Sequence, residues 1–361
     1  MTVPGADSRT DDSSAGKTTG VVFNGADLNS PNFRVTGQVV GATTLDGSAR
    51  FAFVTDSGKV SAWTERSSTT GAVVRVDGPA QEMYDGTPDG SAFFGVAIKP
   101  DTWDTMWLAD FGADPKIVTL DKYWNKVATE GFANPFATGT GGVVKPGDPV
   151  PFNVQVLDGR VFVTYAISQE DAANPGRFYA AEEDALDASA EAASGNKPNK
   201  GKLVEFDLNG GRVRIYADAM RLNAPWGMAI APANFGKLSG ALLVGNFGGA
   251  GRICAFDLSS GTYIDDLRDK ADKPVAIAGL WGLQFGNGES LGDSNALYFA
   301  AGPADEVDGL FGSLRYAGLS QQASLQECRG AHWPRCVLDA SLIKDTNRAT
   351  HAYAKSACKP Q

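Results

Sequence analysis

The chain has 361 residues, of which 43% are hydrophobic, 20% are charged and 43 are glycine. This balance is typical of a turn-rich globular protein and excludes a disordered one. A net charge of −10 disfavours binding to nucleic acid or to anionic membranes, because both need a basic surface, and no apolar run is long enough to span a bilayer.

The N-terminal segment, residues 1–18, is rich in Ser, Thr, Asp and Gly and contains no apolar stretch of the kind found in signal peptides. We expect this segment to be disordered. The chain has four cysteines, three of them beyond residue 327, so they cannot form a disulfide framework for the main body.

From residue 19 onward one short phrase returns five times: a residue that is usually aromatic, then Gly or Asn, then aliphatic residues. The copies are Thr19–Val22, Phe94–Ala97, Phe152–Gln155, Trp226–Ala229 and Trp281–Gln284. Their small residues are 75, 58, 74 and 55 positions apart, which gives a unit of roughly 50–60 residues with two insertions. A repeat of this size is typical of the blades of a β-propeller.

Each phrase is expected to begin the innermost strand of a blade, where a small residue lets neighbouring blades approach. A second strand should end near Thr55, Asp110, Tyr165, Asn246 and Ala301. A third strand should begin with a basic residue followed by an aliphatic one, at Lys59, Lys116, Lys202 and Arg252. The spacing from Asp110 to Ile117 equals that from Asn246 to Ile253, seven residues in both, which supports a true repeat.

The predicted fold is therefore an all-β propeller of five visible blades over residues 19–317, followed by an irregular tail, 318–361. The expected blades cover approximately 19–80, 93–145, 150–222, 223–276 and 277–317. An insertion at residues 168–200 interrupts the third blade, and its acidic, Ala-rich part, 182–193, could form a short helix. This insertion is either a solvated, mobile loop or a lid over one mouth of the ring.

Two local motifs resemble known sites but lack required partners. Gly288–Gly292 matches the Gly-x-Ser-x-Gly nucleophile motif, yet the chain has only two histidines, both in the tail, so a turn is expected. Asp85–Gly90 matches the front half of a calcium loop, but position 12 of the loop is Val96 instead of Glu. It is either a turn or a weak calcium site.

The remaining metal candidate lies in the tail. Its potential zinc ligands are Cys328, His332, Cys336, His351 and Cys358. Their spacing is wider than that of the usual zinc knuckle, so an unstructured tail, or one with an incidental disulfide, is the competing interpretation. Cys254 alternates within a predicted strand and is expected to be a small core residue.

The repeats resemble NHL-type propeller repeats, and the stretch from about Val21 to Tyr316 is similar to an uncharacterised family of exported β-propeller proteins. The resemblance rests on residues 151–155, 163–166, 224–227, 243–248, 279–282, 301–306 and 309–312. It implies about six blades and an extracellular or periplasmic location. The chain lacks the family's first Trp-Gly blade, of which the N-terminal segment could be a remnant, and the C-terminal sorting tail of many bacterial members. The ring is therefore five-bladed, closed by unusual ends, or incomplete.

Polar residues recur at the expected ends of second strands and starts of first strands: Asp110, Asn153, Tyr165, Asn246, Asp305 and Glu306. Gluconolactonase-like propellers, which this chain resembles in its repeats, hold Ca²⁺ at the axis through such oxygens. The alternative is structural, because in NHL-type repeats this Asp often bonds backbone amides of neighbouring strands.

Two functions follow from these observations. The first is a non-enzymatic binding or scaffold protein that uses the mouth of the propeller to bind a protein or a small-molecule ligand. The alternative is a Ca²⁺-dependent hydrolase similar to lactonases or esterases, with Asp110, Asn153, Asn246 and Glu306 as oxygen ligands or base. Neither nucleic acid nor a membrane span is expected.

Overall fold

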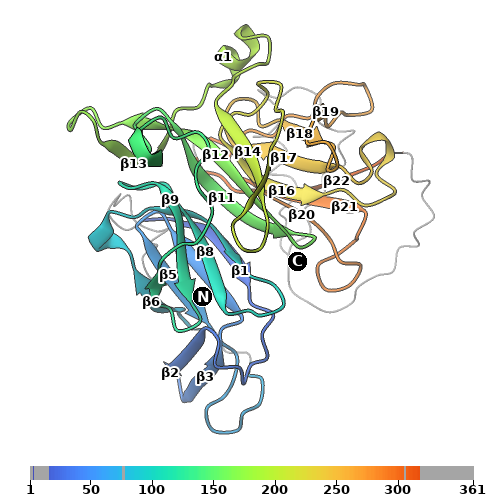
Figure 1. Cartoon of the computed structure of the whole chain (residues 1–361). Helices are drawn as coiled ribbons and strands as arrows, with labels where there is room; N and C mark the ends of the chain where they lie inside the picture. Colours follow the sequence, from blue (N-terminus) through green and yellow to red (C-terminus); the bar gives the residue numbers. More distant parts are fainter. Residues whose placement is uncertain (1–2, 4–15, 75–77, 305, 318–361) are drawn as a thin grey trace. The chain divides into compact units, whose positions relative to one another are not determined.

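The computed structural model describes residue 3 and residues 16–74, 78–304 and 306–317. Nearly all regular structure in this part of the chain is β-strand, arranged in five successive antiparallel sheets (Figure 1). Each sheet is a meander that begins with the strand of one repeated phrase, which is the blade arrangement of a β-propeller. The predicted fold class is confirmed.

By its contacts the chain divides into two compact units, which we call unit 1 and unit 2. Unit 1 comprises Met1–Ala185, Pro198–Tyr216 and Leu222–Pro225, and unit 2 comprises Leu186–Lys197, Ala217–Arg221 and Trp226–Gln361. Unit 1 holds the first three blades, and unit 2 holds the last two together with part of the predicted insertion.

Blades 1 and 2 are four-stranded. Blade 1 contains β1 (Thr18–Phe23), β4 (Phe51–Thr55), β5 (Lys59–Trp63) and β6 (Gln81–Asp85), with a separate hairpin of β2 (Arg34–Val40) and β3 (Thr43–Ser48). Blade 2 contains β7 (Phe93–Ile98), β8 (Thr105–Asp110), β9 (Lys116–Asp121) and β10 (Lys126–Val127). Single 3-10 turns follow β6 and β10, at Thr87–Asp89 and Thr140–Gly142.

Blade 3 carries the insertion. Its strands are β11 (Pro149–Leu157), β12 (Arg160–Glu170), β14 (Gly201–Phe206) and β15 (Arg212–Ile215), and β13 (Phe178–Glu183) pairs with the far half of β12. The predicted short helix is present as α1 (Ala188–Ala193), capped by Asp187, whose side chain accepts hydrogen bonds from two backbone amides. The insertion is thus a hairpin followed by a helix.

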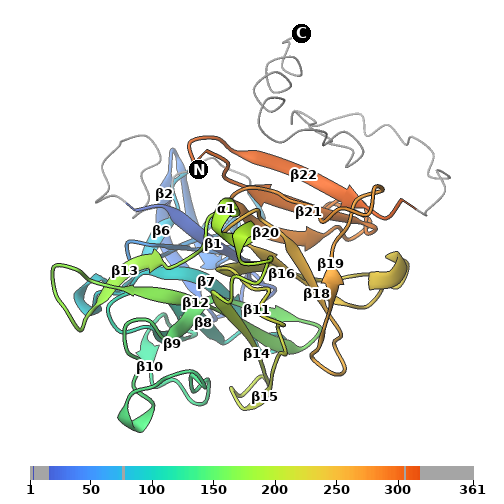
Figure 2. The same cartoon turned by 90° about the horizontal axis from the view of Figure 1, so that it is seen from above.

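Unit 2 contains blades 4 and 5. Blade 4 consists of β16 (Pro225–Ile230), β17 (Leu242–Asn246), β18 (Ile253–Phe256) and β19 (Tyr263–Asp266), with a 3-10 turn at Gly236–Leu238. Blade 5 consists of β20 (Leu280–Phe285), β21 (Ala296–Ala301) and β22 (Leu310–Arg315). In the described residues β22 pairs only with β21 and forms the edge of this sheet (Figure 2).

The small residues of the repeated phrase allow blades to approach, as predicted. A Cβ atom added to Gly95 would lie 2.2 Å from Oδ1 of Asn153 in the next inner strand of unit 1. In unit 2, a Cβ on Gly227 would lie 2.2 Å from the carbonyl oxygen of Trp281. Both distances are far below van der Waals contact, so only glycine fits at these two positions.

Candidate functional site

Asp110, the first predicted metal ligand, ends β8 and is only 3% exposed. Its Oδ1 accepts hydrogen bonds from the backbone amides of Ala92 and Gly112, both at 2.9 Å. Burial raises the pKa of Asp110 to about 6, against the opposing effect of the hydrogen bonds that it accepts. These contacts tie the end of β8 to the residue before β7, which is the structural role that the sequence offered as the alternative.

Asn153 and Tyr165 also lie in unit 1, in different surroundings. Asn153 is buried in β11, and its backbone N–H donates to Oγ1 of Thr164 at 3.1 Å. Tyr165 is fully buried among the apolar side chains between blades 2 and 3, with its ring edge-on to Phe136 at 5.2 Å. The prediction that a strand ends near Tyr165 was wrong, because pairing with β13 extends β12 to Glu170.

Asn246 and Glu306 lie in unit 2. The side-chain Nδ2 of Asn246 donates to the carbonyl oxygen of Arg221 at 3.0 Å, and Oε1 of Glu306 accepts from Nε1 of Trp281 at 2.5 Å. Asp305 lies outside the described residues. Among the residues that are described, no group of three or more His, Cys, Asp or Glu side chains is placed to hold a metal ion. The calcium site stays a prediction.

The other sequence motifs are accounted for by local contacts. In Asp85–Gly90, Asp85 pairs with Lys59 at 2.6 Å and accepts the backbone amide of Thr87 at 2.9 Å. The contact with Lys59, aided by Thr87, lowers the pKa of Asp85 to about 2. Gly288–Gly292 forms a turn between β20 and β21, closed by a 2.7 Å hydrogen bond between its two terminal glycines. The five candidate zinc ligands of the tail lie outside the described residues.

Partly exposed aromatic residues gather in unit 2 near the starts of β16 and β20 and after the end of β17. We call Trp226, Phe247, Trp281 and Glu306 the tryptophan cluster. The ring centroids of Trp226 and Trp281 are 5.5 Å apart at 87°, and those of Phe247 and Trp281 are 4.3 Å apart at 30°. All four residues are partly exposed. The indole N–H of Trp281 is held by Glu306.

Unit 1 contains the matching positions, with different residues. Phe94, Phe111 and Phe152 occupy the same places in blades 2 and 3 as Trp226, Phe247 and Trp281 occupy in blades 4 and 5. Their ring centroids are 5.2–5.8 Å apart, and all three phenylalanines are buried. We call these three residues the phenylalanine cluster. The same two positions of the repeat therefore form a hydrocarbon core in unit 1 and a partly exposed, amphipathic surface in unit 2.

The loop between β21 and β22 places the carboxylate of the tryptophan cluster. Glu306 has a φ of 63°, in the left-handed region that non-glycine residues rarely adopt, and its amide donates to the carbonyl oxygen of Gly302 at 3.2 Å. Such strained residues are found disproportionately at ligand-binding sites. Glu306 also accepts the indole N–H of Trp281, so electron-rich indole faces and a carboxylate lie side by side.

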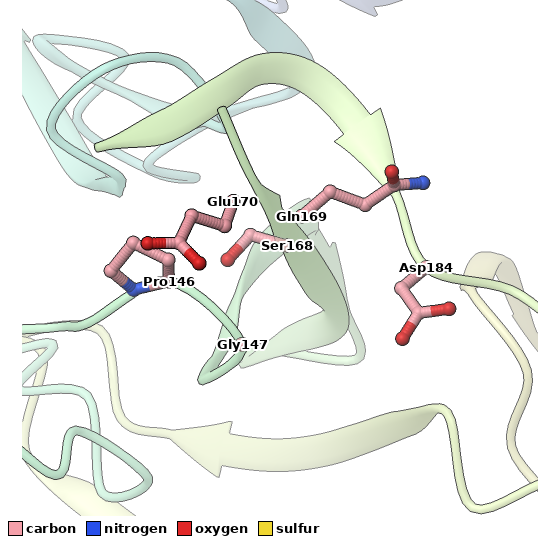
Figure 3. Close-up of a pocket in the computed structure, with 6 residues that line it drawn as sticks. All are labelled: Pro146, Gly147, Ser168, Gln169, Glu170 and Asp184. Atoms are coloured by element: carbon pink, nitrogen blue, oxygen red, sulfur yellow. The ribbon is translucent and has the colours of Figure 1, made fainter. Parts of the chain in front are cut away.

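The hairpin of the insertion borders an open pocket of about 410 Å³ in unit 1 (Figure 3). Its lining residues are Pro146, Gly147, Ser168, Gln169, Glu170 and Asp184. Both carboxylates have partners within the chain: Glu170 accepts the amide of Gly176 at 2.6 Å, and Asp184 forms an ion pair with Lys200. These contacts account for the acidic groups, so we assign this pocket no ligand.

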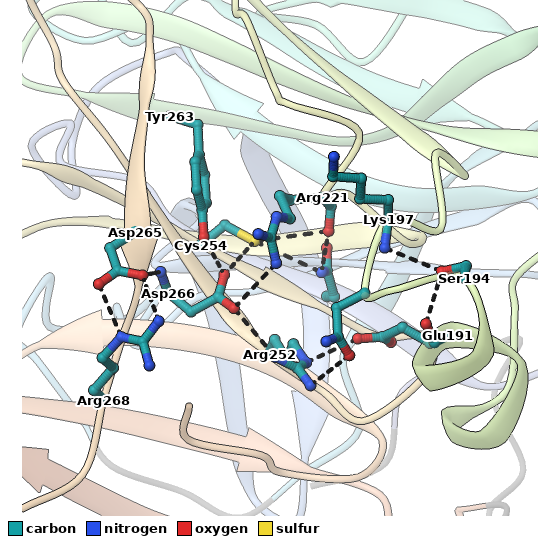
Figure 4. A network of polar contacts seen from close by, with 12 residues as sticks. Glu191, Ser194, Lys197, Arg221, Arg252, Cys254, Tyr263, Asp265, Asp266 and Arg268 are labelled. Atoms are coloured by element: carbon teal, nitrogen blue, oxygen red, sulfur yellow. Dashed lines mark hydrogen bonds and ion pairs between the residues drawn. The ribbon is translucent and has the colours of Figure 1, made fainter. Parts of the chain in front are cut away.

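A buried polar network anchors α1 to blade 4 within unit 2 (Figure 4). Arg252 lies between two buried carboxylates, 2.9 Å from Oε1 of Glu191 and 3.2 Å from Oδ2 of Asp266. Asp266 also accepts the hydroxyl of Tyr263 at 2.8 Å, while burial raises the pKa of Cys254 beside it. Cys254 is thus the buried residue that the sequence predicted.

Sequence reasoning singled out Glu306 but missed the tryptophan cluster and the Arg252 network as sites. The signal for the cluster was present, because the aromatic residue of the phrase changes from Phe to Trp in blades 4 and 5. The network had no such signal, since Glu191 and Arg252 are far apart in the chain and Glu191 is part of an Ala-rich, acidic stretch that suggested solvent exposure.

Similar sequences are known, but without an assigned function. Two uncharacterized proteins of Acanthamoeba polyphaga mimivirus are 32% identical over 227 residues and 30% identical over 232 residues. The matches cover 62% and 63% of this chain and 48% and 52% of the relatives, so the chain spans about half the length of each. No protein-family model matches. The resemblance to exported NHL-type propellers therefore stays a prediction.

Solved β-propellers match the chain at low similarity. The WD40 propeller domain of Doa1 matches with a TM-score of 0.33 and 9% identity, covering 70% of this chain and 57% of that domain. The Dos1 propeller matches with a TM-score of 0.36 and 10% identity, covering 79% and 66%. At this level neither structure informs the function, and the fold assignment rests on the strand order of the sheets. Within the described part of the chain, no helix has the length and apolar character needed to cross a bilayer.

Proposed function

We propose that this chain is a binding protein and that the tryptophan cluster binds a ligand carrying a cationic group. One observation supports the proposal: positions that are buried phenylalanine in unit 1 are partly exposed tryptophan in unit 2, beside the carboxylate of Glu306. Stability alone would favour closing this surface as in unit 1. The partial exposure of an aromatic cluster whose counterpart is buried supports contact with a ligand at this place.

The chemistry of the surface favours a cation. The face of an indole ring attracts Lys, Arg and organic ammonium groups, and each such contact contributes about 0.5–2 kcal/mol. The Glu306 carboxylate adds an ion pair at the same place, and the net charge of −10 attracts cations over longer distances. A basic peptide segment offers both an ammonium or guanidinium group and an apolar stem.

Isothermal titration calorimetry with a short arginine-rich peptide tests the proposal, and a glutamine peptide of equal length is the control ligand. We expect binding that Glu306→Gln weakens about fivefold or more, because it removes the ion pair at the indole. Glu289→Gln is the matched control, since Glu289 lies in an exposed loop of the same blade and carries the same charge. Equal affinity of Glu306→Gln and Glu289→Gln, or no binding at all, would exclude the site.

A further inference from the structure

Residues 186–197, which contain α1, contact blade 4 mainly through polar groups. We call this stretch the latch segment, and it belongs to unit 2 together with β17, β18 and β19. Glu191 is its one buried residue, and none of its apolar side chains is buried. A helix as short as Ala188–Ala193 is not stable in water by itself, because few hydrogen bonds offset the cost of ordering it. The latch segment therefore depends on its contacts with blade 4 for its structure.

Both oxygens of the Glu191 carboxylate contact blade 4 (Figure 4). Oε1 lies 2.9 Å from Nε of Arg252, and Oε2 accepts the backbone N–H of Ala250 at 3.1 Å. Asn196, also in the latch segment, accepts from Nη2 of Arg252 at 2.8 Å. A guanidinium and a backbone amide that each meet one carboxylate oxygen give a strong and directional contact. We call Arg252 and the loop Gly248–Gly251 the carboxylate receptor.

The carboxylate receptor is held in place by unit 2 without help from the latch segment. The backbone carbonyl of Arg252 accepts the amide of Asn246 at 2.9 Å, and its Nη1 lies 3.2 Å from Oδ2 of Asp266. Gly251, with a φ of 67°, accepts the amide of Ile277 at 3.1 Å through its carbonyl oxygen. None of these partners is in the latch segment, so we expect the receptor to keep its shape when that segment leaves. A preorganised receptor spends little free energy on ordering itself for an occupant.

The repeat shows that blade 4 does not need the latch segment to satisfy this cation. Lys59, which begins the third strand of blade 1, pairs with Asp85 in the next strand. Lys116, at the same point of blade 2, pairs with Asp114 two residues before it. Arg252 instead meets a carboxylate from a distant insertion. Its planar guanidinium suits a carboxylate better than an ammonium does, which indicates a position specialised for this contact.

We propose that the carboxylate receptor is a binding site for a glutamate side chain on a short peptide, and that the latch segment occupies it reversibly as an internal ligand. A rigid receptor and an occupant that is unstable by itself form a contact that opens without unfolding the sheets. Opening releases the latch segment from blade 4 and makes Arg252 accessible to a glutamate of a partner peptide. The receptor shares no residue with the tryptophan cluster, so the two proposals are tested independently.

Hydrogen exchange followed by mass spectrometry tests the opening in the wild-type chain. We expect residues 188–197 to exchange about tenfold faster or more than β17 and β18, because the latch segment opens locally. Glu191→Gln should speed this exchange further and leave both strands unchanged. Glu289→Gln, which removes the same charge from an exposed loop of unit 2, is the matched control and should change neither. Exchange of the latch segment at the rate of the strands would overturn the proposal, since it would then open only with the blade.

A synthetic peptide with the sequence of residues 186–197 tests the receptor. It is added to the Glu191→Ala chain, whose own latch segment cannot fill the site, and binding is followed by the NMR shifts of the isotopically labelled peptide. The wild-type chain should bind the peptide about tenfold more weakly or less, because its latch segment competes. The same peptide carrying Glu191→Gln is the control ligand. Equal binding of both peptides, or no binding to a Glu191→Ala chain that circular dichroism shows to be folded, would exclude the site. The wild-type exchange measurement decides the matter if that variant does not fold.

Discussion

The phenylalanine cluster of unit 1 and the tryptophan cluster of unit 2 stand at the same point of the repeat. In both clusters, the aromatic residue that precedes the Gly or Asn of the phrase contacts the equivalent aromatic residue of the next blade. A phenylalanine that follows a second strand packs against this pair. The backbone is thus common to both units, and the side chains decide whether the position is core or surface. A propeller can acquire a site by exchanging a few residues without changing its sheets.

The difference between the two clusters is tested most directly by truncating the phenylalanine that each contains at the same position of the repeat. Phe111→Ala empties a fully buried position and should lower the free energy of unfolding of its unit by about 3–5 kcal/mol. Phe247→Ala removes a partly exposed ring and should cost about half as much. Urea unfolding followed by circular dichroism measures both. Equal losses would mean that the two clusters do not differ in their structural role.

A second difference between the units is the ionic network that holds α1. Arg252→Met should destabilise unit 2 by about 3 kcal/mol, because it leaves the buried carboxylates of Glu191 and Asp266 without their shared partner. Adding Glu191→Leu to this variant should recover part of the loss, since one uncompensated charge is then gone. Urea unfolding of the single and double variants gives both values. A double variant less stable than Arg252→Met would refute this explanation.

Asp110 and Asn246 share a position of the repeat, but only Asp110 titrates. Its pKa rises from 3.8 to about 6 on folding, so the native state binds more protons than the unfolded state between these values. This stabilisation is fully present below about pH 4 and is lost as the pH rises through about 6. We expect Asp110→Asn to abolish a change on the order of 2 kcal/mol, measured as the difference in unfolding free energy between about pH 4 and pH 7. An unaltered pH profile would contradict the buried-carboxylate explanation.

The smallest effect is expected from calcium. The carboxylate of Asp110 already accepts two backbone amides, so millimolar Ca²⁺ should leave the thermal midpoint unchanged. A rise of several degrees that Asp110→Asn removes would instead support the calcium site and the hydrolase, because an ion bound only by the native state stabilises it. Differential scanning calorimetry with Mg²⁺ as the control ion separates the outcomes.

The sheets could be predicted because their strands repeat along the sequence. Contacts between distant segments could not be predicted in this way. The phrase around Gly95 and the regular spacing to Ile117 identify first, second and third strands, because strand registers repeat with the sequence. The pairing of β13 with β12 and the burial of Glu191 by Arg252 depend on contacts between distant segments that leave no period in the chain. The contact of Glu306 with the indole of Trp281 likewise joins a loop residue to a strand 25 positions earlier, so it leaves no period in the chain.

The anchoring of α1 also limits how this protein can be divided. The chain passes between the two units at residues 185/186, 197/198, 216/217, 221/222 and 225/226, so neither unit is one continuous stretch. A fragment that starts at Trp226 would lack both Glu191 and Arg221, and Arg252 and Asp266 would lose charged neighbours. Recombinant halves cut at a blade boundary should therefore aggregate, whereas circular permutants that keep every segment should remain usable for dissecting the two clusters.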